Sequence, residues 1–290
     1  MAVTAAMVKE LRGKTGAGMM DCKKALVETE GNMDSAIDWL RERGISKAAK
    51  KSDRVAAEGL CSVAIDGDVA VIFELNSETD FVAKNEQFLS LLNKVGQILV
   101  ANKPATVEEA LEITVDGVTI SQMLIEVTST IGEKITLRRL QVVEKATDES
   151  FGSYLHMGGR IAALTVVNGK EELAKDLAMH AAAINPQYLR QEDVPGDVVA
   201  KETEILKQEA LNEGKPANIV EKMVVGRVRK FLAEICMVEQ PFVKDGDVTV
   251  AKHIANNGAE IKSFIRLEVG EGIEKTVSNF AEEVMSQVRG

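Results

Sequence analysis

The chain has 290 residues, 45% of them hydrophobic and 28% charged, a length and composition that suit two or three compact globular units. Its formal net charge of −10 and its aromatic content of 4% argue against direct binding of nucleic acid, which favours basic fields and base-stacking rings. Because no run of about 20 apolar residues could span a membrane and no secretory signal opens the chain, we expect a cytoplasmic protein without a membrane partner.

The first 45 residues are expected to form a small domain of three helices. Apolar residues recur every three or four positions in three successive runs, at residues 3–11, 19–26 and 33–40. Gly13 is expected to close the first helix and Gly44 the third. Helices of this length bury little apolar surface, so the domain 1–45 is interpreted as a docking module. Residues 46–55, which are basic and rich in alanine, are assigned to a linker, for which a partly helical form is left open.

Residues 56–146 are assigned to the first half of an α+β core. Two β-rich runs flank Asp66-Gly67-Asp68, which predicts a hairpin with a tight turn. The apolar period then changes to that of a long helix, which begins near Thr79 and ends at Pro104. The elements expected in this half are two strands, two amphipathic helices and a third strand, at residues 59–65, 69–75, 79–103, 119–131 and 135–140.

Residues 147–185 and 229–269 are assigned to the second half of the core. A strand is expected at residues 160–167, followed by a turn and by a helix whose apolar face carries Leu173, Leu177, His180 and Ile184. On this face His180 is interpreted as a hydrogen-bonded core residue. The order strand, asparagine, helix occurs in both halves at a spacing of about 90 residues, which indicates an internal duplication.

Residues 186–228 are assigned to an insertion of two antiparallel helices. The turn Gly214-Lys215-Pro216 joins two amphipathic runs closely enough to form a helical hairpin. The elements expected from here to the end are the two hairpin helices, a strand and a last helix, at residues 198–211, 219–235, 261–269 and 277–288. The last helix belongs to an expected C-terminal helical module, residues 270–290.

The sequence shows no motif typical of catalysis or metal binding. The three cysteines, Cys22, Cys61 and Cys236, form no C-x-x-C pair, and the three histidines have no metal-ligand spacing. Arg12-Gly13-Lys14-Thr15 resembles part of a phosphate-binding loop, but Val8 stands where that loop requires glycine. We therefore predict no catalytic residue, no metal and no cofactor, in a protein that is not an enzyme. An α+β enzyme with an unrecognised site and a passive adaptor are the alternatives.

Two residues at the start of the long helix have ordinary structural interpretations. Asp80 could cap the helix and pair with Lys84 four residues later. Phe81 could be the first residue of the stripe that faces the core. Spacing alone therefore does not distinguish either residue as functional.

Motifs spread over nearly the whole chain point to a known family. The most extensive are Val8-Lys-Glu-Leu-Arg12, Thr15-Gly-Ala-Gly-Met-Met-Asp-Cys-Lys-Lys-Ala-Leu26 and Thr79-Asp-Phe-Val-Ala-Lys-Asn85. Shorter ones follow in order at residues 131–133, 138–139, 152–156, 159–161, 179–181, 214–216, 240–242 and 264–274. In this combination and order, the chain closely resembles the bacterial elongation factor Ts family.

The resemblance implies a fold and a partner. The fold would be α+β, with an N-terminal ubiquitin-associated-like three-helix domain, a two-part core with an internal pseudo-repeat, an inserted antiparallel helical hairpin and a C-terminal helical module. The function would be that of a non-enzymatic guanine-nucleotide exchange factor for elongation factor Tu, the GTPase of translation elongation. The partner is expected in its nucleotide-free and GDP-bound forms, and a homodimer or a 2:2 complex is left open.

The resemblance also implies functional residues. Asp80 and Phe81 would enter the GTPase domain of the partner near its Mg²⁺ and phosphate site, with Phe81 as a steric wedge and Asp80 as its polar companion. Thr79 and Val82 would frame this pair. Further contacts with the partner are implied for Leu11, Arg12, Met19, Met20, Lys23, Ile131, Gly132, His156 and Met237.

Overall fold

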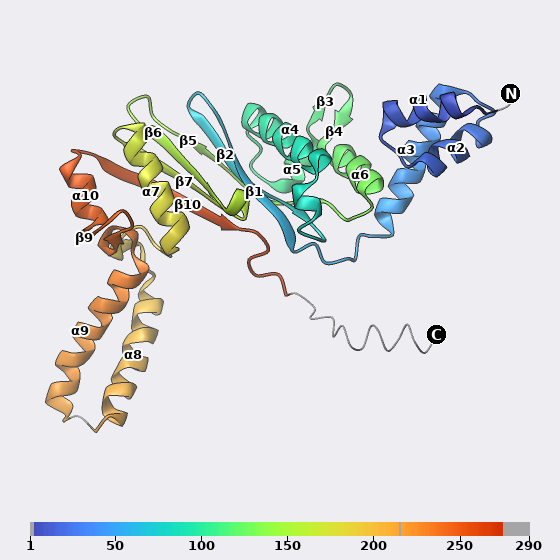
Figure 1. The fold of residues 1–290 in the computed structure, drawn as a ribbon. Coiled ribbons are helices and arrows are strands. Elements are labelled where there is room, and N and C mark those ends of the chain that lie inside the picture. Colours follow the sequence, from blue (N-terminus) through green and yellow to red (C-terminus); the bar gives the residue numbers. More distant parts are fainter. Residues whose placement is uncertain (1–2, 215, 275–290) are drawn as a thin grey trace. The chain divides into compact units, whose positions relative to one another are not determined.

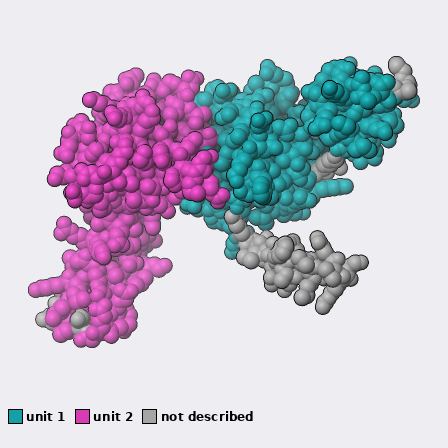
Figure 2. Space-filling view, viewed as in Figure 1, with its two compact units in different colours: residues 1–61, 73–141, 268–290 teal, residues 62–72, 142–267 magenta. Residues whose placement is uncertain are grey.

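The structure is a computed structural model that describes residues 3–214 and 216–274 (Figure 1). The chain forms two compact units, which are coloured separately in Figure 2. Unit 1 comprises Met1–Cys61, Phe73–Gln141 and Glu268–Gly290, and unit 2 comprises Ser62–Ile72 and Val142–Leu267. Helices and antiparallel strands occur together, so the α+β class is confirmed. The helix predicted at residues 277–288, and with it most of the C-terminal module, lies outside the described residues.

Unit 1 begins with three helices, α1 (Ala5–Thr15), α2 (Met19–Glu28) and α3 (Met33–Ala49). Thr4 caps α1, because its hydroxyl accepts a hydrogen bond from the backbone N–H of Met7. The core of the domain is formed by small and apolar side chains of all three helices, Val8, Leu11, Cys22, Ala25, Leu26 and Ala36. The apolar spacing therefore predicted the three helices correctly.

The predicted end of the first helix is wrong. α1 continues past Gly13 and ends at Gly16, whose φ of 66° lies in the left-handed region. In that conformation the N–H of Gly16 donates to the carbonyl oxygen of Arg12 at 2.8 Å, which satisfies one of the last helical carbonyls.

The predicted end of the third helix is also wrong. α3 continues past Gly44 to Ala49, so the linker predicted at residues 46–55 begins inside the helix. Gly44 is buried beside α6 (Ile120–Ile131), and a Cβ atom there would lie 3.2 Å from the hydroxyl oxygen of Ser129. The glycine therefore permits close approach of two helices and does not end one.

The rest of unit 1 combines helices with part of a sheet. The sheet has the order β1-β2-β5, and the predicted hairpin around Asp66-Gly67-Asp68 is formed by its first two strands. The hairpin end of these strands, residues 62–72, and the last residues of β5, from Val142 on, are counted in unit 2. Large apolar side chains, among them Phe73, Phe88, Leu99 and Ile120, are fully buried. The elements are β1 (Glu58–Asp66), β2 (Val69–Ser77), α4 (Glu86–Asn102), α5 (Val107–Glu112), β3 (Thr114–Val115), β4 (Val118–Thr119), α6 and β5 (Thr136–Glu144).

The long helix α4 begins later than predicted. Asn85 caps it, because its side-chain oxygen accepts a hydrogen bond from the N–H of Gln87 at 2.8 Å. Residues 78–81 form a turn, and Val82–Lys84 forms a single turn of 3₁₀ helix before the cap. The interpretation of Asp80 as the helix cap is therefore wrong.

Unit 2 has a second sheet, with the order β10-β7-β6. β6 pairs antiparallel with β7, and Phe151 lies opposite Val166. The strands are β6 (Ser150–His156), β7 (Ile161–Asn168) and β10 (Glu260–Glu268), and the helix α7 (Glu171–Ile184) packs against the first two. In each sheet the middle strand, β2 or β7, is followed in sequence by a helix, which is the order behind the predicted duplication.

Unit 2 includes a helical hairpin, which is formed by α8 (Gly196–Asn212) and α9 (Ala217–Ile235) (Figure 1). Val220, Val224 and Val228 of α9 cluster with Ala210 of α8. The predicted boundary at residue 228 cuts through α9, because its apolar stripe continues without a break to Ile235. The chain then forms β8 (Pro241–Phe242), β9 (Asp245–Thr249) and α10 (Val250–Asn256) before β10. No helix of the described residues is long and apolar enough to cross a membrane.

Candidate functional site

The turn between β2 and α4 exposes one large aromatic side chain. Phe81 is 79% exposed, whereas the next residue, Val82, is only 7% exposed. The interpretation of Phe81 as a core residue is therefore wrong. We call residues 78–84 the Phe81 loop. The side chain of Val82 is buried and anchors this loop, whereas the phenyl ring of Phe81 is exposed to solvent.

Thr79 fixes the base of the Phe81 loop. Its hydroxyl donates to Oε1 of Glu133 at 2.7 Å, and its backbone N–H donates to Oε2 of the same carboxylate at 2.9 Å. The carbonyl oxygen of Thr79 accepts a further hydrogen bond from the Ser77 hydroxyl at 2.9 Å. These three bonds satisfy the backbone of Thr79 and hold it beside the segment that follows α6.

Glu78 makes a second connection to the same segment. Its carboxylate accepts the backbone N–H of Lys134 at 2.6 Å and a guanidinium hydrogen bond from Arg54 at 3.1 Å. The ammonium group of Lys134 in turn donates to the carbonyl oxygens of Ser52 and Arg54. Lys51 donates to the carbonyl oxygen of Gly132. Two basic residues after α3, Lys51 and Arg54, thus bind the segment after α6 and the Phe81 loop.

Asp80 and Lys84 lie on either side of the exposed ring in sequence. Nζ of Lys84 is 2.9 Å from Oδ2 of Asp80, which confirms the pair expected from their spacing. The same nitrogen is 5.9 Å from the centre of the Phe81 ring. Since the side chain of Asp80 is 48% exposed, a carboxylate and a phenyl group are presented together to solvent.

Ile131 and Gly132 lie next to the Phe81 loop, because the adjacent Glu133 bonds Thr79. Gly132 ends α6 with a φ of 93°, and its N–H donates to the carbonyl oxygen of Thr128 at 2.9 Å. Both residues are half-buried. The structure therefore brings two sequence-predicted groups of site residues together, although they are distant in the chain.

The N-terminal helices present some of the predicted contact residues and bury another. Arg12, Met19, Met20 and Lys23 are exposed, and Met20 is 74% exposed. Leu11 is completely buried in the core of the three-helix domain. The prediction that Leu11 contacts a partner is therefore wrong for its side chain, which packs in the core of the domain.

The two predicted contact residues of unit 2 also differ in exposure. His156 ends β6, is exposed, and stacks on Tyr154 with ring centres 6.2 Å apart. Met237 is completely buried in the core of unit 2, so its own side chain offers no surface to a partner, whereas Glu239, two residues later, is exposed. A contact through the stretch around Met237 stays a prediction.

His180 is a satisfied core residue, as predicted. It is completely buried, Nε2 is 2.9 Å from the side-chain oxygen of Gln240, and Nδ1 accepts the backbone N–H of Val243 at 3.2 Å. This arrangement requires the neutral ring with its proton on Nε2. Burial accordingly lowers the pKa of His180.

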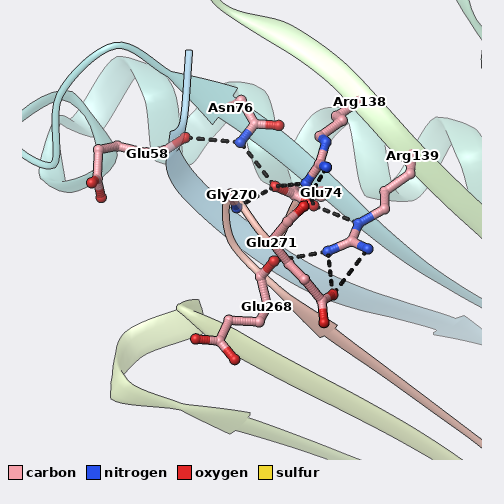
Figure 3. Close-up of polar contacts among 8 residues, drawn as sticks. All are labelled: Glu58, Glu74, Asn76, Arg138, Arg139, Glu268, Gly270 and Glu271. Atoms are coloured by element: carbon pink, nitrogen blue, oxygen red, sulfur yellow. Dashed lines mark hydrogen bonds and ion pairs between the residues drawn. The ribbon is translucent and has the colours of Figure 1, made fainter. Parts of the chain in front are cut away.

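A buried carboxylate forms a second polar centre in unit 1 (Figure 3). Glu74 on β2 is completely buried and accepts hydrogen bonds from Arg138, Arg139, the Asn76 amide and the backbone N–H of Gly270. Burial alone would raise its pKa, but the donors from Gly270, Asn76 and Arg139 outweigh that effect and hold the pKa of Glu74 below its ordinary value. The centre is structural, since every one of these donors belongs to the chain.

Arg139 extends this centre to the segment after β10. Its guanidinium donates to the carbonyl oxygen of Glu268 at 2.8 Å and lies 3.3 Å from the carboxylate of Glu271. Figure 3 shows both arginines and the segment 268–271 converging on Glu74. Sequence reasoning missed Glu74, and the adjacent arginines in the matched motif at residues 138–139 were its only signal.

The described residues do not form a reactive or metal-binding cluster. Among them, no group of three or more histidine, cysteine, aspartate or glutamate side chains is placed to hold a metal ion. Cys22, Cys61 and Cys236 are buried and unpaired with each other. Burial raises the pKa of the Cys61 thiol to about 12, so this sulfur is protonated and unsuited to nucleophilic attack.

Comparison with protein families gives one match. The family model described as elongation factor TS matches residues 78–271. The match begins at Glu78, the first residue of the Phe81 loop, and ends at Glu271 in the segment that converges on Glu74. It covers more than half of the chain and parts of both units. The chain therefore belongs to the elongation factor Ts family.

Proposed function

We propose that the Phe81 loop drives GDP release from elongation factor Tu. Membership of the elongation factor Ts family implies a role in translation elongation as the nucleotide exchange factor of this GTPase. Such a role takes place in the cytoplasm and requires no catalytic residue in the chain itself. The observation that carries the proposal is the exposure of Phe81, 79%, on a loop whose base is fixed by hydrogen bonds.

An exposed phenylalanine on a fixed loop is suited to intrusion. Large apolar groups near the centre of an interface contribute most of its binding energy when they fill a pocket. GTPases hold GDP largely through Mg²⁺ and through backbone N–H groups around the phosphates. Phe81 would separate these partner elements, while Asp80 would compete for polar contacts or disturb the Mg²⁺ shell. Thr79 and Val82 hold the pair in place.

The thermodynamics sets a condition on this mechanism. The chain must bind nucleotide-free partner more tightly than GDP-bound partner, and GDP must weaken binding of the chain by the same factor. A factor with equal affinity for both forms would shift no equilibrium, however tightly it bound. The exposed residues Arg12, Met19, Met20 and Lys23 would supply affinity that does not discriminate between the two forms.

Other surfaces would complete the interface. Ile131 and Gly132 would contact the partner next to Phe81, because they share the same network of loops. His156 would reach a different domain of the partner. A 2:2 complex or a homodimer is compatible with this proposal and is decided by measuring the mass of the complex in solution.

Release of a fluorescent GDP analogue from elongation factor Tu tests the proposal. The chain is added in substoichiometric amount with excess unlabelled GDP, and the decay of fluorescence is followed. Multiple-turnover acceleration supports exchange activity. Binding without acceleration would identify a passive adaptor, and no interaction would contradict the proposed partner. Ile65→Ala serves as a matched control, because Ile65 is an exposed apolar residue outside the loop.

A further inference from the structure

Two loops of unit 1 are joined by reciprocal hydrogen bonds, in which a carboxylate of each loop accepts a backbone N–H of the other. Glu78 accepts the backbone N–H of Lys134 at 2.6 Å, and Glu133, the residue before Lys134, accepts the backbone N–H of Thr79 at 2.9 Å. Each loop thus donates one N–H and supplies one carboxylate. We call this reciprocal pair of bonds the crossed lock, formed by Glu78, Thr79, Glu133 and Lys134.

The crossed lock is stronger than a pair of ordinary loop contacts. Hydrogen bonds to ionised acceptors are about twice as strong as bonds between neutral groups. Glu133 also accepts the Thr79 hydroxyl at 2.7 Å, so both oxygens of its carboxylate bind the same residue. The side chain of Glu78 is only 18% exposed and is neutralised by Arg54. Solvent therefore competes weakly for the hydrogen bond between the Glu78 carboxylate and the N–H of Lys134.

Phe81 depends on the backbone around it for its position. Because its ring is 79% exposed, few contacts with the chain fix it directly. Fixing the backbone of a residue costs conformational entropy, so a turn of this kind stays ordered only when neighbouring groups hold it. Two residues before Phe81, Thr79 receives that support from Glu133, which lies 54 positions later in the sequence.

We propose that the crossed lock pre-organises the Phe81 loop for nucleotide exchange and that Glu133 is the positioning residue of that reaction. The inference rests on the proposed function of Phe81. A loop already held in its intruding shape spends less of the binding energy on ordering, so more is available to displace GDP. Loosening the lock therefore lowers the rate of release within the complex, while the exposed residues of α1 and α2 maintain binding.

The test compares Glu133→Ala with the wild-type chain across a range of chain concentrations. The expected result is a maximum GDP-release rate about tenfold lower, as for the loss of a charge-assisted hydrogen bond. The half-saturating concentration should change by less than about threefold, because contacts that are made equally before and after release are preserved. Glu133→Gln should restore part of the rate, since an amide oxygen still accepts the Thr79 N–H. Glu108→Ala, at an exposed glutamate of unit 1 outside the lock, should match the wild type.

Two further measurements separate positioning from general damage. In a Phe81→Ala background, Glu133→Ala should have almost no additional effect, because the lock acts through the ring. Amide hydrogen exchange should show lost protection at Thr79, with helix α4 unchanged. If Glu133→Ala does not fold, Thr79→Val replaces it in the same cycle. This variant removes the hydroxyl that donates to Glu133 and accepts the Val82 N–H, and it keeps the backbone N–H of Thr79 bonded to Glu133.

The outcomes distinguish the two proposals. A wild-type chain that fails to accelerate GDP release overturns the proposed function. An active wild type with an equally active Glu133→Ala variant overturns the crossed lock alone. So do independent, multiplying effects of Glu133→Ala and Phe81→Ala, which would mean that Glu133 acts elsewhere.

Discussion

Glu74 accepts the backbone N–H of Gly270 at 2.8 Å, across 196 positions of sequence. Gly270 has a φ of 74°, and a Cβ atom there would lie 2.3 Å from the carbonyl oxygen of Ala57. Only glycine fits this place, since a side chain would be strained and would collide with the backbone. One buried carboxylate thus ties the segment after β10 to the sheet of unit 1.

Removing Glu74 is expected to destabilise unit 1 strongly. Glu74→Ala removes the buried carboxylate that binds the guanidinium groups of both Arg138 and Arg139, and Arg139 keeps the exposed carboxylate of Glu271. Breaking a buried ion pair costs about 3–5 kcal/mol, and the partial exposure of both arginines places this case near the lower end. Urea denaturation measures the change. Glu271→Ala is the matched control, because that carboxylate is 51% exposed and should contribute less than about 1 kcal/mol. A similar loss for both variants would contradict the central role of Glu74.

The same carboxylate predicts a dependence of stability on pH. The pKa of Glu74 is lower in the folded chain than the ordinary value of 4.5, because its donors outweigh burial. Its contribution to stability is therefore fully present above pH 4.5 and is lost as the pH falls through the folded value. Other carboxylates titrate in this range too, so the relevant quantity is the difference between the wild type and Glu74→Gln. That difference should shrink as the pH falls below 4.5, and a constant difference would disprove the linkage.

Replacing Phe81 is expected to affect exchange without affecting stability. Phe81→Ala removes a side chain that is mostly in solvent, so the free energy of unfolding should change by less than about 0.5 kcal/mol. The rate of GDP release should fall at least about tenfold, because a ring that fills a pocket contributes about 2 kcal/mol or more. Stopped-flow fluorescence with elongation factor Tu measures the rate. An unchanged rate would remove Phe81 from the mechanism but would leave the family membership intact.

The helices of this chain were largely predictable, and their ends were not. Apolar spacing gave the three N-terminal helices and both helices of the hairpin, since periodicity reports the face that is buried. Asp80 and Asn85 are equally good capping residues by type. The structure uses Asn85, because a turn of 3₁₀ helix comes between the strand and α4. Nothing in the sequence marks that extra turn.

The exposure of the predicted site residues could be foreseen only in part. The family resemblance selected the exposed Phe81 and Met20 and the half-buried Gly132, but it also selected the buried Leu11 and Met237, because a resemblance extends over residues that shape a domain as well as over its surface. Glu78 and Glu133 were missed as a pair. Their partners lie 56 and 54 positions away, and carboxylates of an acidic chain are expected to be solvated.

His180 is expected to make stability depend on pH in a different range. Burial lowers its pKa from the ordinary 6.5, so the unfolded chain takes up this proton at higher pH than the folded chain does. Stability should therefore fall as the pH decreases below 6.5. His180→Leu should cost about 2 kcal/mol at neutral pH, because Gln240 and the N–H of Val243 lose a partner. Between pH 7 and pH 5 the free energy of unfolding of the wild type should fall relative to that of this variant. An equal change of the free energy of unfolding with pH in both proteins would contradict the linkage to His180.

Leu11 and Met20 offer a direct comparison of a core residue with a surface residue in one small domain. Leu11 is completely buried, so Leu11→Ala should reduce the stability of the domain by about 3 kcal/mol through lost burial and a cavity. Met20 is 74% exposed, so Met20→Ser should change stability by less than about 0.5 kcal/mol while weakening binding to elongation factor Tu. Denaturation of each variant, with calorimetric titration of the partner, gives both quantities. A destabilised Met20→Ser variant would place Met20 in the core, and full affinity in a stable Met20→Ser variant would move the docking surface of the domain away from α2.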